Sequence, residues 1–384
     1  MRVLVAHNRY RRALPSGENI GVDREVAALR DRGVTVDLLL AESDDIAGFG
    51  LGQRLTLPAR PTWSATTRHR FRTMIEAQRP DLVHLHNPYP LLSPALVNWA
   101  AAAGLPVVQT VHNVRHVCLA GTFARDGEPC RDCAGRRFPW PGVVHGCYRG
   151  ARGPSLALAV AHTAHRRTWS RVDRFIAVSD YVADEIIAAG LPAGRTVVRA
   201  NGIPDPGWPT APGSGVLFAG RLSAEKGIDV LLEAWADVRL RPWAPLRIAG
   251  DGPLRARVQA AAASDPDVEY LGPLDHYQMS AALTDAAVVA VPSRTPEALP
   301  TVVPEAFAHG RAVIAGQVGA LPSMVDDRVG AVVAPEPGPF AEAVRACLGD
   351  ATARGHAARA RYLEEYTVTR AMDRLLAIYG EVLD

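Results

Sequence analysis

The stretch Gly220-Arg-Leu-Ser-Ala-Glu-Lys-Gly227 contains the only lysine of the 384-residue sequence. It follows a strand-like apolar run over 216–219 and precedes a helix-like pattern over 229–238. Backbone N–H groups and the helix dipole favour anions at such a turn, and a lysine adds a compact positive charge. The stretch therefore predicts a phosphate-binding turn with Arg221 and Lys226 as its cations. An ordinary βα turn with a solvated lysine is the alternative.

The same alternation of apolar strand-like runs and helix-like runs extends in both directions from this turn. Strands are predicted at 3–6, 34–40, 81–86, 107–111, 174–178, 196–200, 216–219, 246–249, 268–271, 287–291 and 312–314. This βαβ pattern predicts an α/β fold in which helices cover parallel sheets. A single core rarely grows beyond about 250–300 residues. The length of 384 residues therefore predicts two Rossmann-like domains.

The strongest linker signal is the run from Pro204 to Ser214, which is rich in proline and glycine. It places a domain boundary between an N-terminal domain over 1–203 and a C-terminal domain over 204–365. A last helix is predicted at 366–384. Ligands of such folds bind beyond the carboxyl ends of the strands.

The predicted C-terminal domain carries two carboxylates eight residues apart, Glu297 and Glu305, around a loop that ends at a helix start. Carboxylates accept hydrogen bonds from hydroxyl groups, so this pair suits sugar and ribose hydroxyls near a bound phosphate. Gly250, in another strand-to-helix turn, offers a further backbone contact for an anion. In the alternative interpretation, Glu305 only complements a helix dipole and Glu297 is solvated.

Two histidines, His86 and His112, follow predicted strands directly. Their position at carboxyl ends makes them better site candidates than scattered histidines. A hydrogen-bonded structural histidine is the alternative for each.

An insertion over 114–153 breaks the βα rhythm and contains four cysteines, Cys118, Cys130, Cys133 and Cys147. A C-x-x-C pair with two further cysteines, in a loop with little core of its own, predicts a structural zinc site closed by four thiolates. Four unligated thiols in a reducing cytosol are the alternative. The fifth cysteine, Cys347, lies in an apolar helix pattern and is predicted to be core.

Composition excludes several classes of protein. A net charge of +2 gives no global reason to bind nucleic acid. No run of about 18 apolar residues predicts a membrane span, and the apolar start is too short for a signal peptide. We therefore expect a cytoplasmic protein. Arginines at 68, 70, 72, 149, 152, 166 and 167 allow peripheral contact with anionic lipid at the inner membrane face, or form a solvated surface.

These motifs together resemble the retaining nucleotide-sugar glycosyltransferases of family 4, the group 1 transferases, which have the two-domain GT-B fold. The resemblance rests on the turn over 220–227, on Glu297-x7-Glu305 with Glu-Ala-Phe-Ala-x-Gly310, on Asn201-Gly-Ile203, on Thr110-Val-His112, and on Ser16-Gly17-Glu18. It covers essentially the whole chain. It implies retention of anomeric configuration, a nucleoside-diphosphate sugar as donor, and no bound catalytic metal.

The resemblance also implies roles for particular residues. Arg221 and Lys226 would hold the donor diphosphate, Glu305 the ribose hydroxyls, and Glu297 the hydroxyls of the transferred sugar. His112 would lie beside that sugar, which makes His112, Arg221, Lys226 and Glu297 the catalytic candidates. The remaining donor-binding candidates are Gly17, Gly220, Gly250, Leu299, Pro300 and Thr301. The last helix, 366–384, would return to the N-terminal domain.

Some alternatives stay open at this point. Ala298 and Ser16 stand where family members usually have glycine, which leaves the identity of the donor open. The acceptor is a polysaccharide or lipid-linked glycan, or a small natural product such as an aminocyclitol, and the oligomeric state is open. The competing functions are a GT-B nucleotide-sugar epimerase or hydrolase and a non-catalytic sugar-binding subunit. A nicotinamide-dependent dehydrogenase is a weaker rival, because neither half has G-x-G-x-x-G after a first strand.

Overall fold

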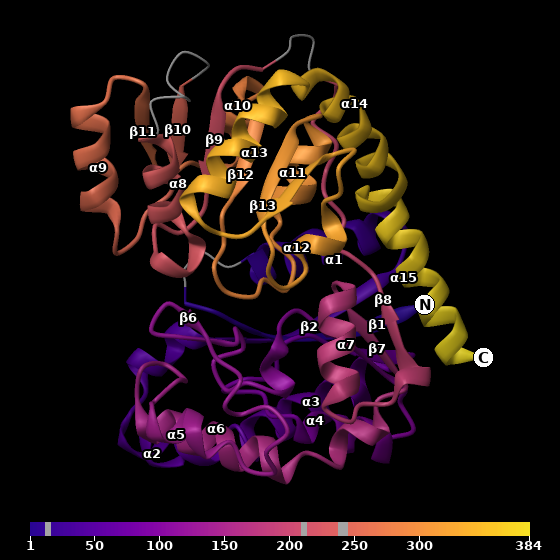
Figure 1. Ribbon diagram of the computed structural model, residues 1–384. Coiled ribbons are helices and arrows are strands. Elements are labelled where there is room, and N and C mark those ends of the chain that lie inside the picture. Colours follow the sequence, from indigo (N-terminus) through magenta and orange to yellow (C-terminus); the bar gives the residue numbers. More distant parts are fainter. Residues whose placement is uncertain (12–16, 209–212, 237–244) are drawn as a thin grey trace. The chain divides into compact units, whose positions relative to one another are not determined.

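The computed structural model describes residues 1–11, 17–208, 213–236 and 245–384. They form two compact units, coloured along the sequence in Figure 1. The first unit comprises Met1–Phe123, Arg131–Gly202 and Ala371–Asp384, and the second comprises Ala124–Cys130 and Ile203–Arg370. Parts of two predicted features, the linker at 209–212 and the helix end at 237–238, lie outside the described residues, as does Ser16.

The first unit is built on a parallel sheet with the strand order β2-β1-β3-β4-β7-β8. The strands are β1 (Arg2–Arg9), β2 (Thr35–Glu42), β3 (Leu82–Leu85), β4 (Val107–Val111), β7 (Arg174–Ala177) and β8 (Thr196–Val198). Every residue of β3 and β4 is buried, as expected for central strands covered on both faces. Because β2 and β3 flank β1 on opposite sides, the chain changes direction there, which is where open α/β sheets bind ligands.

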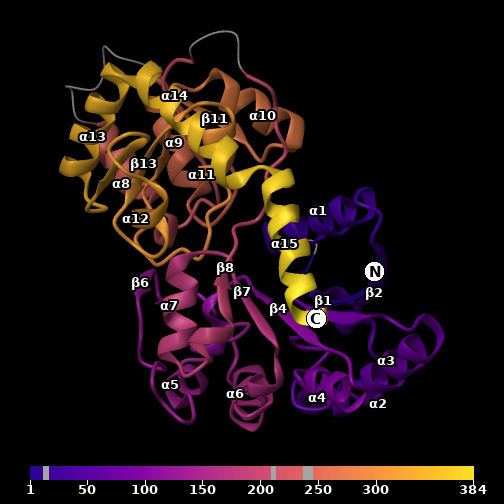
Figure 2. The ribbon, with the colours of Figure 1, turned by 90° about the vertical axis from the view of Figure 1, so that its right-hand side faces the viewer.

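Helices surround this sheet. They are α1 (Gly17–Asp31), α2 (Leu51–Thr56), α3 (Ala65–Gln78), α4 (Ala95–Ala102), α5 (Trp140–Val144), α6 (Arg152–Ala164), α7 (Asp180–Ala188) and α15 (Val368–Leu383). The last of these, α15, lies beside α1 in Figure 2. Arg32, which directly follows α1, forms an ion pair with Asp373 of α15 at 2.8 Å. The α15 side chains Met372, Leu375 and Ile378 are buried. The end of the chain is therefore part of the first unit's core.

The second unit contains another parallel sheet, with the order β11-β10-β9-β12-β13-β14. Its strands are β9 (Val216–Ala219), β10 (Leu246–Ala249), β11 (Val268–Gly272), β12 (Val288–Val291), β13 (Ala312–Gly316) and β14 (Gly330–Val333). Its helices are α8 (Ile228–Trp235), α9 (Arg255–Ser264), α10 (His276–Asp285), α11 (Val302–Ala308), α12 (Leu321–Met324), α13 (Pro337–Gly349) and α14 (Ala351–Arg361). Cys347 is fully buried in the core between the sheet and α13, which confirms its predicted role.

The insertion has little regular structure. It contains a two-stranded hairpin of β5 (Ala124–Arg125) and β6 (Glu128–Pro129), followed by the short helix α5. The hairpin residues belong to the second unit, although the chain on either side of them belongs to the first.

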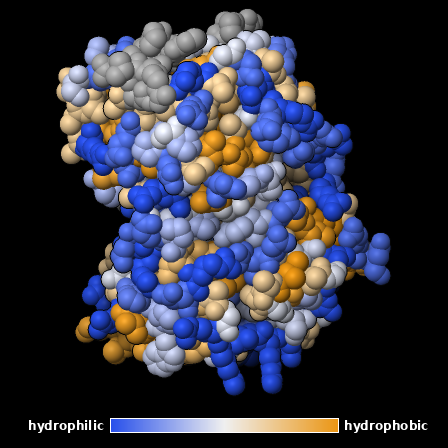
Figure 3. Space-filling view, in the orientation of Figure 1, coloured by the Kyte–Doolittle hydropathy of each residue, from blue (hydrophilic) through white to orange (hydrophobic). Residues whose placement is uncertain are grey.

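The face shown in Figure 3 is mainly hydrophilic in each unit, with small apolar areas between the polar ones. Among the described residues, no helix is both long enough and apolar enough to cross a bilayer.

Candidate active site

In the second unit, the lysine-containing turn lies directly against the segment that follows β12. Gly227 has φ +68°, and a Cβ at this position would stand 1.9 Å from the carbonyl oxygen of Pro292. Only glycine permits both the backbone angle and the close approach. The contact holds Lys226, at the end of a 3₁₀ turn (Ala224–Lys226), beside the loop that contains Glu297.

Lys226 and Glu297 are hydrogen-bonded, with 2.5 Å between Nζ and Oε1. The hydroxyl of Ser293 donates to the same carboxylate oxygen at 2.7 Å. The backbone of Glu297 is also held, because its carbonyl accepts from the Ala320 amide at 2.8 Å. Lys226 and Glu297 keep 33% and 15% of their side-chain surface exposed, so a ligand can reach both.

A second pair of turns meets at the ends of β9 and β10. The Gly220 amide donates to the Ala249 carbonyl at 3.1 Å. A Cβ on Gly250, which has φ +134°, would come within 1.9 Å of the Gly220 carbonyl oxygen. Arg221, the residue after Gly220, is exposed, and its guanidinium makes no ion pair with any described residue. These turns therefore present an unneutralised cation and close-packed backbone, as a phosphate site requires.

The predicted loop over 299–301 leads into α11. The Val303 amide donates to Pro300 and the Glu305 amide to Thr301, both at 3.0 Å, which begins the helix. Glu305 lies in the first turn and is half-buried. Its carbonyl accepts from the ring of His309 at 2.8 Å. The carboxylate is therefore placed by a rigid helix start.

The first unit brings three histidines together at the carboxyl ends of neighbouring strands. His7 lies near the end of β1, and His86 and His112 directly follow β3 and β4. Nδ1 of His86 lies 2.9 Å from Nε2 of His112, and the two rings stack with centroids 5.2 Å apart. Of these histidines, the family resemblance singled out only His112 as a catalytic candidate; the structure shows His86 as its direct partner.

These histidines are neutral at physiological pH. Burial lowers the pKa of His7 and of His84, a buried residue of β3, from 6.5 to about 4. Burial, together with the neighbouring histidines and Arg199, holds the pKa of His86 well below 6.5. The pKa of His112 is depressed in the same way. Each ring therefore has one N–H and one lone pair.

The sequence did not predict a polar network that lies beside His112. Glu18, one residue after the predicted Gly17 at the start of α1, accepts from the hydroxyl of Tyr10 and from Asn113 Nδ2, both at 3.2 Å. Arg115 donates to the same hydroxyl at 3.1 Å. Burial raises the pKa of Glu18 to about 7, against the opposing effect of Arg115.

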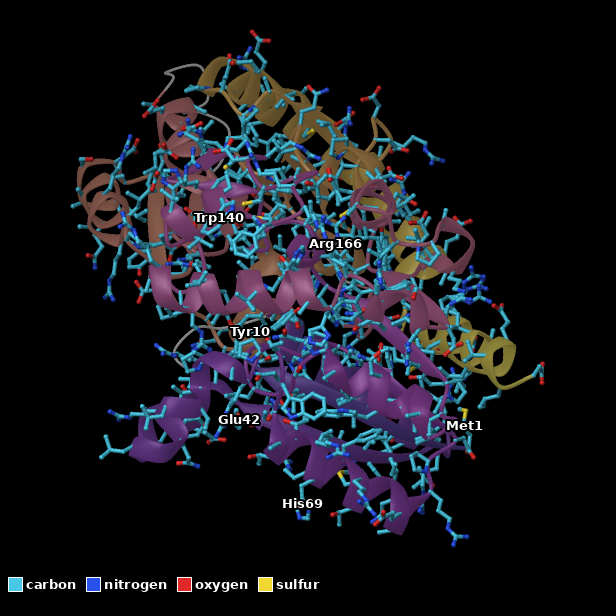
Figure 4. The ribbon with its side chains drawn as sticks, turned by 90° about the horizontal axis from the view of Figure 1, so that it is seen from below. Met1, Tyr10, Glu42, His69, Trp140 and Arg166 are labelled. Carbon is cyan, nitrogen blue, oxygen red and sulfur yellow. The ribbon has the colours of Figure 1, made fainter. Side chains whose placement is uncertain are left out.

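This network lies at the ligand-binding end of the sheet. Glu18, Asn113 and Arg115 line one pocket with His86 and His112. Figure 4 shows Tyr10 and Glu42, at the carboxyl ends of β1 and β2, on one side of the unit and Met1 at the other. Of these residues, Glu18 belongs to a motif that the sequence analysis used, Ser16-Gly17-Glu18, whereas Tyr10 and Arg115 belong to none.

The four cysteines of the insertion are not gathered around one point. In the part of the chain that the structure describes, one group brings three potential metal ligands within 4.8 Å of one another, and it consists of Glu25, His84 and His86. Thiolates around a tetrahedral zinc lie closer than that distance. Cys130 belongs to the second unit and the other three cysteines to the first. The zinc site stays a prediction.

Comparison with known proteins agrees with the fold. The structure of Anabaena HepE in complex with UDP-glucose matches with a TM-score of 0.67 and 17% identity, over 99% of this chain and 100% of that one. Sucrose-phosphate synthase from Thermosynechococcus elongatus matches with a TM-score of 0.70 and 18% identity, over 99% and 98%. The chain therefore has the GT-B fold, two parallel-sheet units with helices.

Family models match both units. The model described as "Glycosyltransferase Family 4" matches residues 15–205, and "Glycosyl transferases group 1" matches residues 213–350. Fold and site thus define an enzyme of the nucleotide-sugar glycosyltransferase class. The chain belongs to the group 1 glycosyltransferases of family 4, a family of retaining enzymes.

Two relatives are similar to this chain in sequence. A D-inositol 3-phosphate glycosyltransferase of Catenulispora acidiphila is 28% identical, covering 79% of this chain and 73% of the relative. A phosphatidyl-myo-inositol mannosyltransferase of Mycobacterium leprae is 26% identical, covering 96% and 94%.

Proposed function

We propose that the chain transfers a sugar from a nucleoside-diphosphate sugar to a hydroxyl acceptor with retention of configuration, and that the second unit binds the donor. The observation that carries the proposal is the pair of Lys226 and Glu297, with Arg221 exposed in the same turn. One cation without an ionic partner among the described residues and one cation held by a carboxylate suit a ligand with a diphosphate and a polyhydroxyl part.

In the proposed reaction, the bond between the anomeric carbon and the diphosphate oxygen breaks. The acceptor oxygen forms its new bond on the same face, and its proton passes to the departing phosphate. Products are the glycosylated acceptor and a nucleoside diphosphate. Arg221 and Lys226 stabilise the negative charge on the leaving diphosphate more strongly as it develops, so they lower the barrier.

Donor binding redistributes the partners of Lys226. The diphosphate competes with Glu297 for the ammonium group, and the carboxylate then accepts from hydroxyls of the transferred sugar. Glu305 accepts from the ribose hydroxyls, and Gly17, Gly220, Gly250 and residues 299–301 complete the donor site. His112 contacts the transferred sugar from the first unit.

The acceptor binds the first unit in this proposal. The network of Tyr10, Glu18 and Arg115 supports a polyhydroxyl acceptor, because it offers both hydrogen-bond donors and acceptors beside His112. The candidates are a polysaccharide or lipid-linked glycan and a small natural product such as an aminocyclitol. Both named relatives act on inositol compounds by their names, so inositol phosphates and phosphatidylinositol belong among the acceptors to be tested.

We further propose a cytoplasmic enzyme with peripheral contact to the inner membrane face. Leu51 and Leu55 of α2 are 84% and 82% exposed, and Arg68 and Arg70 are exposed on α3. Apolar and basic side chains of this kind support binding to anionic lipid.

The test is a panel of nucleoside diphosphates and nucleotide sugars in a thermal-shift assay, because a ligand bound only by the native state raises the unfolding temperature. Hits are then incubated with each candidate acceptor, and the products are analysed by mass spectrometry. A glycosylated acceptor with the donor's anomeric configuration is expected. Free sugar or an epimerised nucleotide sugar as the only product would instead identify a hydrolase or an epimerase, and donor binding without turnover a sugar-binding subunit.

A further inference from the structure

A continuous chain of buried groups leads from α1 to His112. Oε1 of Glu25 lies 3.4 Å from Nε2 of His86, and Nδ1 of His86 lies 2.9 Å from Nε2 of His112. The second oxygen of Glu25 is paired with Arg199. Side chains of Glu25, His86 and Arg199 are 7%, 1% and 3% exposed, so water does not compete for these contacts.

The position of the protons follows from the unpaired atoms. Oε1 of Glu25 and Nε2 of His86 are both buried without a conventional hydrogen-bond partner among the residues that the structure describes. A proton on Nε2 of His86 turns its positive end toward the carboxylate oxygen 3.4 Å away, an electrostatic contact that falls short of regular hydrogen-bond geometry. Without that proton, two lone pairs would face each other in a buried site, at a considerable cost in free energy.

The other nitrogen near this oxygen, Nδ1 of His84, does not supply the proton. It lies 3.4 Å from Oε1 of Glu25, but the hydroxyl of Tyr379 is only 2.6 Å away. A tyrosine hydroxyl that donates to Nδ1 requires a lone pair there, and His84 then donates through Nε2 to the Thr110 hydroxyl at 2.8 Å.

The proton on Nε2 of His86 determines the tautomer of the next ring. With its only proton on Nε2, the neutral His86 has a lone pair on Nδ1 and accepts from Nε2–H of His112. Nδ1 of His112 then keeps its own lone pair, and it forms no hydrogen bond to any described residue. His112 lines the pocket in the first unit.

We infer that Glu25 and His86 are positioning residues that hold His112 as the Nε2–H tautomer, so that Nδ1 accepts a hydrogen bond from a hydroxyl of the transferred sugar. The hydrogen bond from the sugar hydroxyl rests on the proposed function, whereas the tautomer of His112 does not. The opposite tautomer would present a donor at the same place and would favour a carbonyl or phosphate oxygen over a hydroxyl hydrogen.

A cation held by Glu25, His84 and His86 is disfavoured by the same contacts. Arg199 already neutralises the carboxylate, and its charge would repel a metal ion at close range. Both ring nitrogens of His84 also have hydrogen-bond partners.

The decisive variant is Glu25→Gln, which preserves shape and reverses the hydrogen bond. The amide oxygen pairs with Arg199 and the amide nitrogen faces His86 as a donor. His86 then carries its proton on Nδ1, donates to His112, and moves the proton of His112 to Nδ1. ¹⁵N NMR of protein labelled at histidine reports which ring nitrogen is protonated, and His112→Asn identifies the resonances of His112.

We expect Nε2–H for His112 in the unmodified protein at pH 7 and Nδ1–H in Glu25→Gln. His86→Asn, whose amide can turn either way, should give both tautomers and provides the second variant if Glu25→Gln folds poorly. Glu381→Gln, which removes an exposed ion pair with Arg174 in the same unit, should leave His112 unchanged. Nδ1–H in the unmodified protein, or an unchanged tautomer in Glu25→Gln, overturns the inference.

Ligand binding tests the hydrogen bond from the sugar hydroxyl separately. In calorimetry with UDP, GDP and the corresponding sugar nucleotides, Glu25→Gln should bind the nucleoside diphosphate as the unmodified protein does. Its affinity advantage for the sugar nucleotide should fall by about tenfold, the scale of one hydrogen bond. An unchanged advantage refutes the acceptor role of Nδ1, because the hydroxyl then accepts equally well from Nδ1–H. If no nucleotide binds the unmodified protein, the proposed function fails while the NMR result still decides the tautomer.

Discussion

Lys226 and Glu297 form a hydrogen-bonded ion pair of 2.5 Å across 71 residues of sequence. The pair joins the turn after β9 to the loop after β12, two strands that are neighbours in the sheet. Because Lys226 is also the only lysine in the sequence, its chemistry can be addressed without interference from other ammonium groups.

Lys226→Ala should lower turnover by about 10²–10³-fold, the usual loss for one charge-stabilising donor at a leaving group. The fold should remain, since the residue lies in a polar turn and is one-third exposed. Arg257→Ala, which removes an exposed ion pair with Glu233 in the same unit, is the matched control and should keep full activity. Steady-state kinetics with the identified donor measure the turnover of both variants. Unchanged turnover in Lys226→Ala would refute a role of Lys226 in stabilising the leaving diphosphate.

Substitutions of Glu305 and Glu297 should have different effects on the binding of the nucleotide and of the sugar. Glu305→Ala should weaken the binding of the nucleoside diphosphate itself, because the lost contact is to the ribose. Glu297→Ala should leave that ligand nearly unaffected and weaken the nucleotide sugar. Calorimetry on both variants with both ligands measures this, and an equal loss for both ligands in both variants would contradict the division of roles.

Tyr379→Phe should loosen α15 from the first unit, because it removes a buried hydrogen bond of 2.6 Å to His84. Net loss of such a bond costs about 1 kcal/mol, and more where the partner stays unsatisfied. Amide hydrogen exchange in residues 371–383 should therefore become several-fold faster. Tyr277→Phe, at a side chain 84% exposed, should not change it. Exchange that is identical in both variants would show that the hydroxyl contributes nothing.

Acid should destabilise the protein below pH 6.5. Burial lowers the pKa of His7 and His84 to about 4 and of His116 to about 3. Between these values and 6.5 the unfolded chain binds more protons than the native chain, so stability is lost as pH falls. Glu18 acts in the opposite direction: burial raises its pKa to about 7, and its contribution is lost as pH rises through that value. One carboxyl does not offset several histidines.

Thermal unfolding between pH 7.5 and 5 measures this effect. The midpoint should fall on acidification, and His116→Gln should reduce the slope because it removes one buried group that must be protonated. His69→Gln, at an exposed histidine of α3, should leave the slope unchanged. A midpoint that is independent of pH in this window would show that the histidines are not buried in solution.

The cysteine prediction is tested by elemental analysis of protein purified without added metal. One equivalent of zinc, lost in Cys133→Ser and in Cys147→Ser but kept in Cys347→Ser, would establish a structural site. It would also require the four thiols to lie closer to one another than they do in the structure. Zinc below about a tenth of an equivalent in reduced, active protein would leave a cysteine-rich loop without metal.

Much of the fold was predictable because its signals are local. Short β-branched runs and the helix patterns between them specify parallel sheets, since each element must bury one face. The turn over 220–227 was readable for the same reason: strand, glycine, cation and helix start follow each other within a few residues. The positions of Glu297 and Glu305, in a loop and at a helix start, also made them predictable as binding candidates. The roles of these residues stay predictions.

The contacts between these elements were decided only by tertiary structure. Nothing in the sequence pairs Glu25 with Arg199, 174 residues away, or Tyr379 with His84, 295 residues away. His86 gained its importance only when strand order placed it beside His112. A sequence pattern records which face of an element is apolar, whereas a buried polar contact depends on which strands become neighbours and on the distance between two side chains. The proton positions that we infer for His112 follow from such contacts and from no local signal.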